Sequence, residues 1–252
     1  MQVFRVVAMT RTFADLHLRA NPKDQQATQR LVGKAAQFGY SQISVPFTSR
    51  PNEEELAKLK AMCREASVDF VSRADFYPRS EAELTRFLRK FRRQFEVICI
   101  SCDSKEVARQ AAKDRRVDLL NFSSLDYHKR FFDRAEAELA SGSLAALEFD
   151  IKPLLILEGP PRVRLLMSLS REVAVAKEFH VPIVVSSGVA EARLMRMPKD
   201  MASLAFLFGL DEASALDTVS SSPAAIVKRN REKLSSRFVA PGISVVKEGK
   251  GQ

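Results

Sequence analysis

The sequence is poor in residues that build many enzyme sites. Its 252 residues include three histidines, three cysteines, three tyrosines and no tryptophan. An odd number of cysteines, in a chain long enough to bury its own core, argues against the disulfide framework of small secreted proteins. No uninterrupted apolar segment is long enough to cross a bilayer, and the first residues lack the cleavage pattern of a signal peptide. We therefore expect a protein of the reducing cytosol without a membrane-spanning segment.

Acidic residues are also in the minority. Lys and Arg number 40 against 31 Asp and Glu, which gives a net charge of +9 and a pI near 9.6. Such a surplus favours a polyanionic partner, either nucleic acid or a phosphate-rich membrane surface. The scarcity of Trp and Tyr does not indicate a base-stacking platform for single strands. Recognition of folded RNA through its backbone fits better.

Short β-branched runs alternate with longer amphipathic stretches, as in repeated βα units around a parallel sheet. Ser80 followed by Glu83 forms a capping box at the start of one of these helices. After the last predicted strand the pattern changes to helix following helix. The sequence therefore predicts an α/β fold, a TIM-like (β/α) barrel of about seven parallel strands with extra C-terminal helices. The predicted strands are Phe13–Leu18, Gln42–Pro46, Asp69–Phe76, Phe95–Ser101, Val117–Phe122, Leu147–Ile151 and Ile183–Ser187.

The chain shows no linker, low-complexity block or repeat beyond the βα alternation. We expect a single domain over residues 1–240 and a flexible tail over 241–252, which is rich in Gly and Lys at its end. The apolar stretch "LAFLFGL" is predicted to lie in the core, because Leu204, Phe208 and their neighbours recur at helical spacing.

The stretch "FADLHLRA" resembles the first strand of a barrel metal hydrolase. There, Asp-x-His-x-His places two imidazoles on one side of the strand, since alternate residues share a face. Here Asp15 and His17 are present, and Arg19 stands in place of the second His. A hydrolytic centre needs several converging ligands, so Asp15 and His17 are kept only as residual metal candidates. Asp15, Asp75 and Asp150 are explained equally well as partners of barrel arginines.

Other motifs have structural explanations. In "CISC" the thiols of Cys99 and Cys102 point to opposite faces of a strand and have no second pair, so both are predicted to be core residues. Ser186 and Ser187 lack a Gly-x-Ser-x-Gly elbow and a suitably placed His, which excludes a standard hydrolase triad. His180 is predicted to lie at a helix C-terminus.

Cations gather at the predicted carboxyl ends of the strands, the end at which barrel proteins carry function. Guanidinium groups bind phosphate oxygens in a bidentate manner and ammonium groups act as point charges, so the set suits a polyanion. Two helical runs, "RFLRKFRRQ" and "KRNREK", add like charges that repel unless another surface neutralises them. The strand-end set consists of Arg19, Arg50, Arg79, Lys105, Lys152, Arg193, Arg196 and Lys199.

Three blocks of the sequence resemble one family, ribonuclease P protein component 3, the roughly thirty-kilodalton subunit of the archaeal and eukaryotic enzyme. The blocks are "FADLHLRA", "FEVICISCDSKEVARQAAKDRRVDLLNFSS" and "IVVSSGVAEARLMRMPKDMASLAFLFGLDEASALDTVSSSPAAIVKRNREK". They occur in the family's order and are spread over most of the chain, from residue 13 to residue 233, and the last is the most specific.

The resemblance implies a TIM-like barrel related to the polymerase-and-histidinol-phosphatase (PHP) metal hydrolases, generally without their full metal site. The family's "ADLDLR"-like strand also ends in Arg, as here at Arg19, whereas His17 departs toward the hydrolase pattern. The resemblance further implies an accessory subunit of an endoribonuclease with no catalytic residue and no cofactor of its own. The RNA component, with magnesium bound chiefly by RNA, removes the 5′ leader from precursor tRNA.

The partners implied by the resemblance are ribonuclease P RNA and, indirectly, precursor tRNA. A small ferredoxin-like subunit, component 2, is expected to join this chain in a heterodimer or heterotetramer. The expected location is the cytoplasm, or the nucleus for a eukaryotic chain. The predicted RNA contacts are Arg19, Lys105, Arg193, Arg196 and Lys199, with Lys228, Arg229 and Arg231 as a second patch.

The alternative hypothesis is a PHP-like metal-dependent phosphoesterase. It rests on Asp15 and His17 sharing one strand face, and it predicts phosphate release from small esters that depends on manganese or zinc and on His17.

Overall fold

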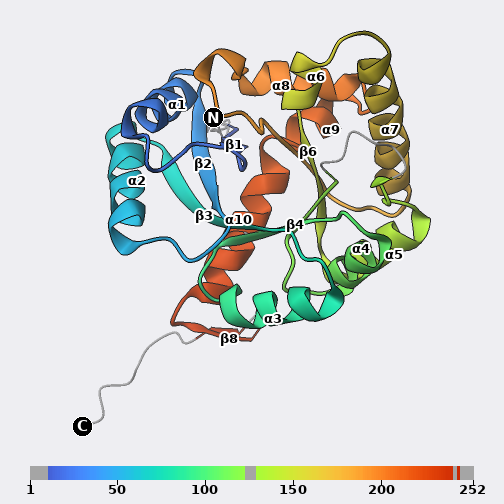
Figure 1. The fold of residues 1–252 in the computed structure, drawn as a ribbon, viewed down its shortest axis with the longest axis horizontal. Helices are drawn as coiled ribbons and strands as arrows, with labels where there is room; N and C mark the ends of the chain where they lie inside the picture. The colour runs from blue at the N-terminus through green and yellow to red at the C-terminus, as the bar shows by residue number, and fades with distance from the viewer. Residues whose placement is uncertain (1–10, 123–128, 241–242, 245–252) are drawn as a thin grey trace, which may run out of the picture.

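The computed structural model describes residues 11–122, 129–240 and 243–244. Seven parallel strands form one sheet in which every strand pairs with its neighbours in sequence, from β1 to β7. Figure 1 shows helices arranged around these strands, as in a TIM-like barrel. The predicted fold class is confirmed. The strands are β1 (Phe13–Asp15), β2 (Tyr40–Phe47), β3 (Asp69–Phe76), β4 (Val97–Ser101), β5 (Leu119–Asn121), β6 (Ala146–Asp150) and β7 (Ile183–Ser186).

Each predicted strand is present, and the third has the predicted bounds. The first is shorter than predicted because the segment after Asp15 no longer pairs with β2 alone. The Leu18 N–H still donates to the Ser44 carbonyl on the β2 side at 2.9 Å, but the Arg19 N–H donates to the Val189 carbonyl on the β7 side at 2.9 Å. Two neighbours therefore hold the segment that follows β1.

The helices have clear sequence causes. Side-chain oxygens accept hydrogen bonds from first-turn N–H groups at several starts, including Asn52, Ser80 and Ser104. The helices are α1 (Gln25–Gln37), α2 (Glu53–Glu65), α3 (Glu81–Phe91), α4 (Lys105–Lys113), α5 (Arg134–Ser143), α6 (Lys152–Ile156), α7 (Gly159–Glu178), α8 (Pro198–Phe206), α9 (Glu212–Asp217) and α10 (Ser221–Leu234), with a 3-10 turn, η2 (Ala192–Leu194). Among the residues that the structure describes, no helix has the length and apolar character needed to span a bilayer.

The gap between β7 and β1 is bridged without an eighth strand in the described part of the sheet. The Ala14 N–H donates to the Val219 carbonyl at 2.9 Å, and the Val185 N–H donates to the Thr218 carbonyl at 3.0 Å. The turn between α9 and α10 therefore satisfies the backbone groups of both edge strands.

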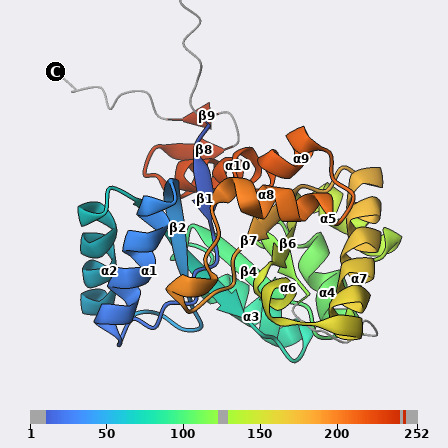
Figure 2. The ribbon, with the colours of Figure 1, turned by 90° about the horizontal axis from the view of Figure 1, so that it is seen from above.

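Helix α10 closes the amino-terminal end of the barrel. Its Ile226 and Val227 belong to the same buried cluster as Leu16 and Cys99 inside the barrel. At the far end of the helix, the Asn230 amide donates to the carbonyl of Glu96, directly before β4. Figure 2 shows α10 across one end of the molecule with β8 and β9 beside it. The amino-terminal end of the interior is thus apolar and plugged by α10.

Two details differ from the sequence predictions. The core prediction for "LAFLFGL" is wrong in part: Phe208 is buried, but Phe206 and Leu207 are 47% and 57% exposed, because α8 ends there and only one face of it packs inward. A short antiparallel hairpin, β8 (Phe238–Ala240) and β9 (Ile243–Ser244), was not predicted. Most of the predicted tail, residues 241–242 and 245–252, lies outside the described residues.

Candidate functional site

A network of buried charged side chains fills the carboxyl end of the barrel. Alternate residues on a strand share a face, so strand positions two apart point into the interior together. On β3 and β6 these positions are Arg73 with Asp75 and Glu148 with Asp150, and His17 lies two residues beyond the end of β1. The chain thereby brings residues more than 130 positions apart into contact.

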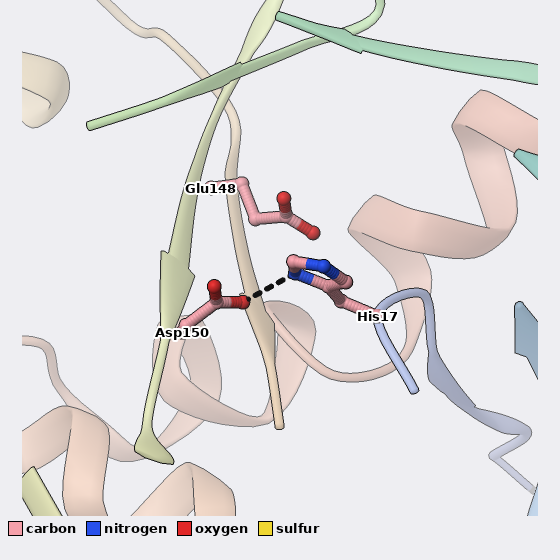
Figure 3. A group of neighbouring side chains, drawn as sticks. All are labelled: His17, Glu148 and Asp150. Carbon is pink, nitrogen blue, oxygen red and sulfur yellow. Dashed lines mark hydrogen bonds and ion pairs between the residues drawn. The ribbon is translucent and has the colours of Figure 1, made fainter. Parts of the chain in front are cut away.

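His17 is held between two carboxylates. Its Nδ1 lies 2.7 Å from Asp150 Oδ1, as Figure 3 shows, and its Nε2 lies 3.1 Å from Asp75 Oδ2. Burial alone would lower the pKa of His17, but the charges of Asp150 and Asp75 outweigh it and raise the pKa to about 10. The ring is therefore an imidazolium that donates from both nitrogens.

Arg73 is the central cation of the network and is fully buried. Its Nη1 and Nη2 donate to the two carboxylate oxygens of Glu148 at 2.6 and 2.7 Å, and its Nε donates to Asp75 Oδ1 at 2.5 Å. Nη1 also donates to the Leu16 carbonyl at 2.7 Å, which ties β1 to β3. This bidentate geometry is the strongest form of arginine–carboxylate pairing.

The cations of the network lower the pKa values of two neighbouring carboxyl groups, Asp75 and Asp150. Burial opposes ionisation of Asp75, but Arg73 and then His17 hold the pKa of Asp75 far below its usual range. Burial likewise opposes ionisation of Asp150, and His17 is the main cause of the lowered pKa of Asp150. Arg19, at the mouth, adds a third positive charge 3.5 Å from Asp150 Oδ2. The three acids Asp75, Glu148 and Asp150 thus face three cations.

Asp15 has a different role. Its Oδ1 accepts from the backbone N–H groups of His17 at 3.1 Å and Ser187 at 3.0 Å, which links the segment after β1 to the end of β7. Its Oδ2 is buried and accepts no hydrogen bond from the part of the chain that the structure describes, and burial raises the pKa of Asp15. The side chain therefore acts as a structural connector between these two segments.

The network does not fit a metal ion. Ligand atoms of His17, Glu148 and Asp150 do lie within 4.8 Å of one another, as a metal site would require. However, both nitrogens of His17 already face carboxylates, and Arg73 occupies both oxygens of Glu148. A protonated imidazole has no lone pair to give, and the guanidinium supplies the positive charge that a metal would bring. His17 is consequently part of a salt-bridge network, and Asp15 binds backbone N–H groups.

Gly188, directly after the β7 end, is required by the network. Its φ of +64° is disfavoured for other residues, and a Cβ there would lie 2.7 Å from Asp150 Cγ. Its N–H donates to the His17 carbonyl at 3.0 Å. The glycine of "VVSSGVAE" thus lets the β7–η2 segment pack directly against the His17–Asp150 pair.

Beside the network lies a cavity of about 370 Å³. Arg19 and Lys152 bring cations to it, and Asn121 and Glu148 lie on its inner side. Phe149 and Leu169 contribute apolar surface. The mouth therefore combines a neutralised interior with a cationic border.

Of the predicted strand-end cations, Arg19 and Lys152 line this cavity, whereas Lys105, Arg193, Arg196 and Lys199 are not among its lining residues. Arg19, Lys105, Arg193 and Lys199 are exposed, and Arg196 is half-buried. Arg193 pairs with Glu191 at 2.6 Å, and Arg196 donates to the Met195 carbonyl at 2.8 Å. We call Arg19, Lys105, Arg193, Arg196 and Lys199 the carboxyl-end rim.

The second predicted patch lies at the opposite end of the barrel. Lys228 is exposed, but Arg229 pairs with Asp118 at 3.1 Å, and Arg231 pairs with Asp69 at 2.6 Å and with Glu96. Two of its three cations therefore already neutralise acids at the amino ends of the strands.

Sequence reasoning missed Arg73 and Glu148, the centre of the network. Each lies in a strand among apolar residues, and nothing at the position itself shows that its side chain points into the barrel. The available signal was the i, i+2 spacing of Arg73 with Asp75 and of Glu148 with Asp150 on two inward faces. The minor predictions hold: Cys99 and Cys102 are buried in different clusters, and His180 follows the end of α7 with a positive φ of 55°.

Known proteins resemble this chain over nearly its whole length. A family model described as RNase P subunit p30 matches residues 12–235. Ribonuclease P protein component 3 of Methanosarcina barkeri is 29% identical, covering 94% of this chain and 97% of its own. Its namesake from Methanothermobacter thermautotrophicus is 24% identical, covering 94% and 96%.

Solved structures share the fold. A chain in the cryo-EM structure of archaeal ribonuclease P with mature tRNA matches with a TM-score of 0.79 at 20% identity, covering 94% of this chain and all of that one. The inactive dihydroorotase-like domain of a Chaetomium thermophilum CAD-like multifunctional protein matches with a TM-score of 0.50 at 9% identity, covering 86% and 79%. Both show a common barrel architecture.

Gly188→Ala should destabilise the protein, because the new methyl group collides with Asp150 and the backbone conformation is strained. We expect the free energy of unfolding in urea to fall by more than about 1 kcal/mol. Gly33→Ala is the matched control: it lies on the exposed face of α1 with nothing near its Cβ, so it should stabilise by about 0.5–1 kcal/mol. Equal stability of wild type and Gly188→Ala would contradict this packing.

The imidazolium of His17 should make stability depend on pH. Because the folded pKa lies above the unfolded value of 6.5, the stabilisation is complete below pH 6.5 and is lost as pH rises toward 10. We expect the free energy of unfolding to fall from pH about 6.5 to about 7.5, a window that lies below the ordinary thiol pKa of about 8.5. His17→Gln should show a shallower dependence. Buried Glu136, whose pKa burial raises to about 8, contributes equally to both proteins. Identical slopes would contradict the assignment.

Proposed function

The chain belongs to the RNase P subunit p30 family and is therefore a protein subunit of ribonuclease P; on this premise we propose that it binds and stabilises the catalytic RNA while the RNA removes the 5′ leader from precursor tRNA. The family match over residues 12–235 is the observation that carries the proposal. The surplus of nine positive charges and the cationic border of the barrel support it.

The proposed mechanism is electrostatic. Where RNA helices pack closely, their phosphates repel, and cations of the carboxyl-end rim lower that repulsion. The RNA then needs less magnesium to reach its active fold. We assign no cofactor and no catalytic residue to this chain, because the charged groups of the barrel neutralise one another. The metal that serves cleavage would be magnesium held by the RNA.

We further propose that a small ferredoxin-like subunit, component 2, pairs with this chain in a heterodimer or heterotetramer. A solved assembly of archaeal ribonuclease P contains a chain of this fold together with mature tRNA, which supports partnership with RNA and with other subunits. The cytoplasm, where an archaeal-type enzyme would meet precursor tRNA, is the expected location.

The phosphoesterase alternative has no support from the geometry. It requires an open metal site with a bound water. His17 and Glu148, two of the three candidate ligands, are fully engaged in salt bridges.

Reconstituted cleavage tests the proposal directly. Ribonuclease P RNA and the small partner subunit should remove the 5′ leader of precursor tRNA at limiting magnesium much faster when this chain is added, because its cations replace part of the magnesium requirement. High magnesium, at which the RNA folds with less help, is the internal control. No change in rate at any magnesium concentration, with a folded partner present, would overturn the proposal.

Arg193→Ala combined with Arg196→Ala should weaken binding to ribonuclease P RNA about tenfold, since two phosphate contacts are removed. The slope of log K against log salt concentration should become shallower by about 1 to 2. Melting temperature should not change, because neither side chain lies in the core. Arg30→Ala with Lys60→Ala, exposed on α1 and α2, removes the same charge elsewhere and is the control. Equal affinities of the two double variants would refute the site.

A further inference from the structure

Three basic segments that are far apart in the chain meet at the amino-terminal end of the barrel. Arg92 follows α3, Arg115 lies just before β5, and Arg229 and Lys233 lie in the last turns of α10. Arg92 Nη1 is 2.6 Å from Asp118 Oδ2, and Arg229 Nη2 is 3.1 Å from Asp118 Oδ1. A single carboxylate therefore joins two of the segments. We call Arg92, Arg115, Arg229 and Lys233 the amino-end cluster.

The acid at the centre of this cluster is already saturated. Asp118 is buried, and besides the two arginines it accepts from the Asn230 amide at 2.8 Å and from the Ile98 N–H at 2.9 Å. Because both of its oxygens are occupied, it cannot take a further cation from the surface. One buried negative charge faces four positive charges.

Neighbouring acids do not correct the imbalance. Asp114 is paired with Arg116 at 2.6 Å, and Asp69 and Glu96 are paired with Arg231. Within residues 11–122 and 129–240, Arg115 and Lys233 form no ion pair, and both are exposed. The cluster therefore presents uncompensated positive charge to solvent.

The pKa of Lys233 is lowered by partial burial and by the positive charges around it. Partial burial lowers the pKa of Lys233, and the nearby charges of Arg229, Arg92 and Arg115 lower it further against the opposing effect of Asp118. A lysine surrounded by more cations than anions is stabilised when an external anion arrives. The fold holds these cations together at an electrostatic cost that an external anion would relieve.

We propose that the amino-end cluster is a second RNA-binding surface, which takes phosphates of an RNA backbone at the end of the barrel opposite the carboxyl-end rim. Arg92 and Arg229, positioned by Asp118, form the fixed part, and Arg115 and Lys233 reach the phosphates. The chain then braces two RNA segments separated by the length of the strands. This inference rests on the proposed function and adds to it a second RNA-binding surface of the barrel. Of the α10 residues predicted from the sequence, Arg229 belongs to this cluster and Arg231 to the neighbouring ion pairs.

The decisive variant is Arg115→Ala with Lys233→Ala in the full chain, because these two exposed side chains form no hydrogen bond or ion pair with the described residues. Binding to transcribed ribonuclease P RNA, measured across a salt series, should weaken about tenfold, and the salt slope should become shallower by about 1 to 2. Arg115→Lys with Lys233→Arg keeps both charges and should retain the wild-type slope. Combined with Arg193→Ala and Arg196→Ala, the losses in binding free energy should add, as for distant sites.

The control is again Arg30→Ala with Lys60→Ala, and melting temperatures check that each variant is folded. If Arg115→Ala with Lys233→Ala matches this control, the second surface is refuted, while wild-type binding and restored cleavage leave the proposed function standing. Wild-type protein that neither binds the RNA nor restores cleavage refutes the proposed function itself. Unchanged RNA affinity with lost affinity for the small subunit would reassign the cluster to a protein contact and overturn the inference.

Discussion

The bidentate pair of Arg73 and Glu148 is the interaction on which the rest of the barrel depends. It joins β3 to β6 across the interior, and through the Leu16 carbonyl it also holds the segment after β1. Such a buried pair adds little net stability over an apolar core of equal volume, yet breaking it by removing one partner costs about 3–5 kcal/mol. The pair therefore acts mainly by restricting which strands can pack together. A strand without an acid opposite Arg73 would leave the buried guanidinium unpaired. The His17 imidazolium between Asp75 and Asp150 extends the same constraint to the mouth.

This constraint explains why the hydrolase-like residues Asp15 and His17 do not form an open metal site in the described barrel. A metal site needs unprotonated ligands and an open coordination position. Here a guanidinium and an imidazolium take the place of the metal charge, and every carboxylate they face is used. The charges of the network therefore balance one another, and the unpaired cations of the described residues, such as Lys105 and Lys199, lie on the surface.

The sequence was sufficient for the fold because local patterns and the global architecture agree. Alternating strand and helix signals, caps such as Ser80 and the change to helices after β7 all describe a barrel with added helices. The site was only partly predictable. Arg19 in place of a second His indicated a lost metal site, and Asp75 and Asp150 were already explained as partners of cations. Arg73 and Glu148 could not be paired from the sequence, because contact between β3 and β6 depends on how the barrel curves. The exposure of Phe206 was missed for a similar reason, since periodicity does not show where a helix ends.

The distribution of charge then decides which surfaces are available. A run of charges in a sequence does not show which cations form ion pairs within the fold, and α10 illustrates the difference. Arg231 pairs with two acids, while Lys233, two residues later, forms no ion pair among the described residues. Helix α10 crosses the amino-terminal end of the barrel and plugs it. Its basic C-terminal end therefore lies beside Arg92, which follows α3, and Arg115, which precedes β5. The apolar requirement of the core, at Ile226 and Val227, thus places cations where the strands begin, and the βα loops place others where the strands end. A barrel closed in this way carries positive charge at both ends, which is the arrangement that the two proposed RNA-binding surfaces require.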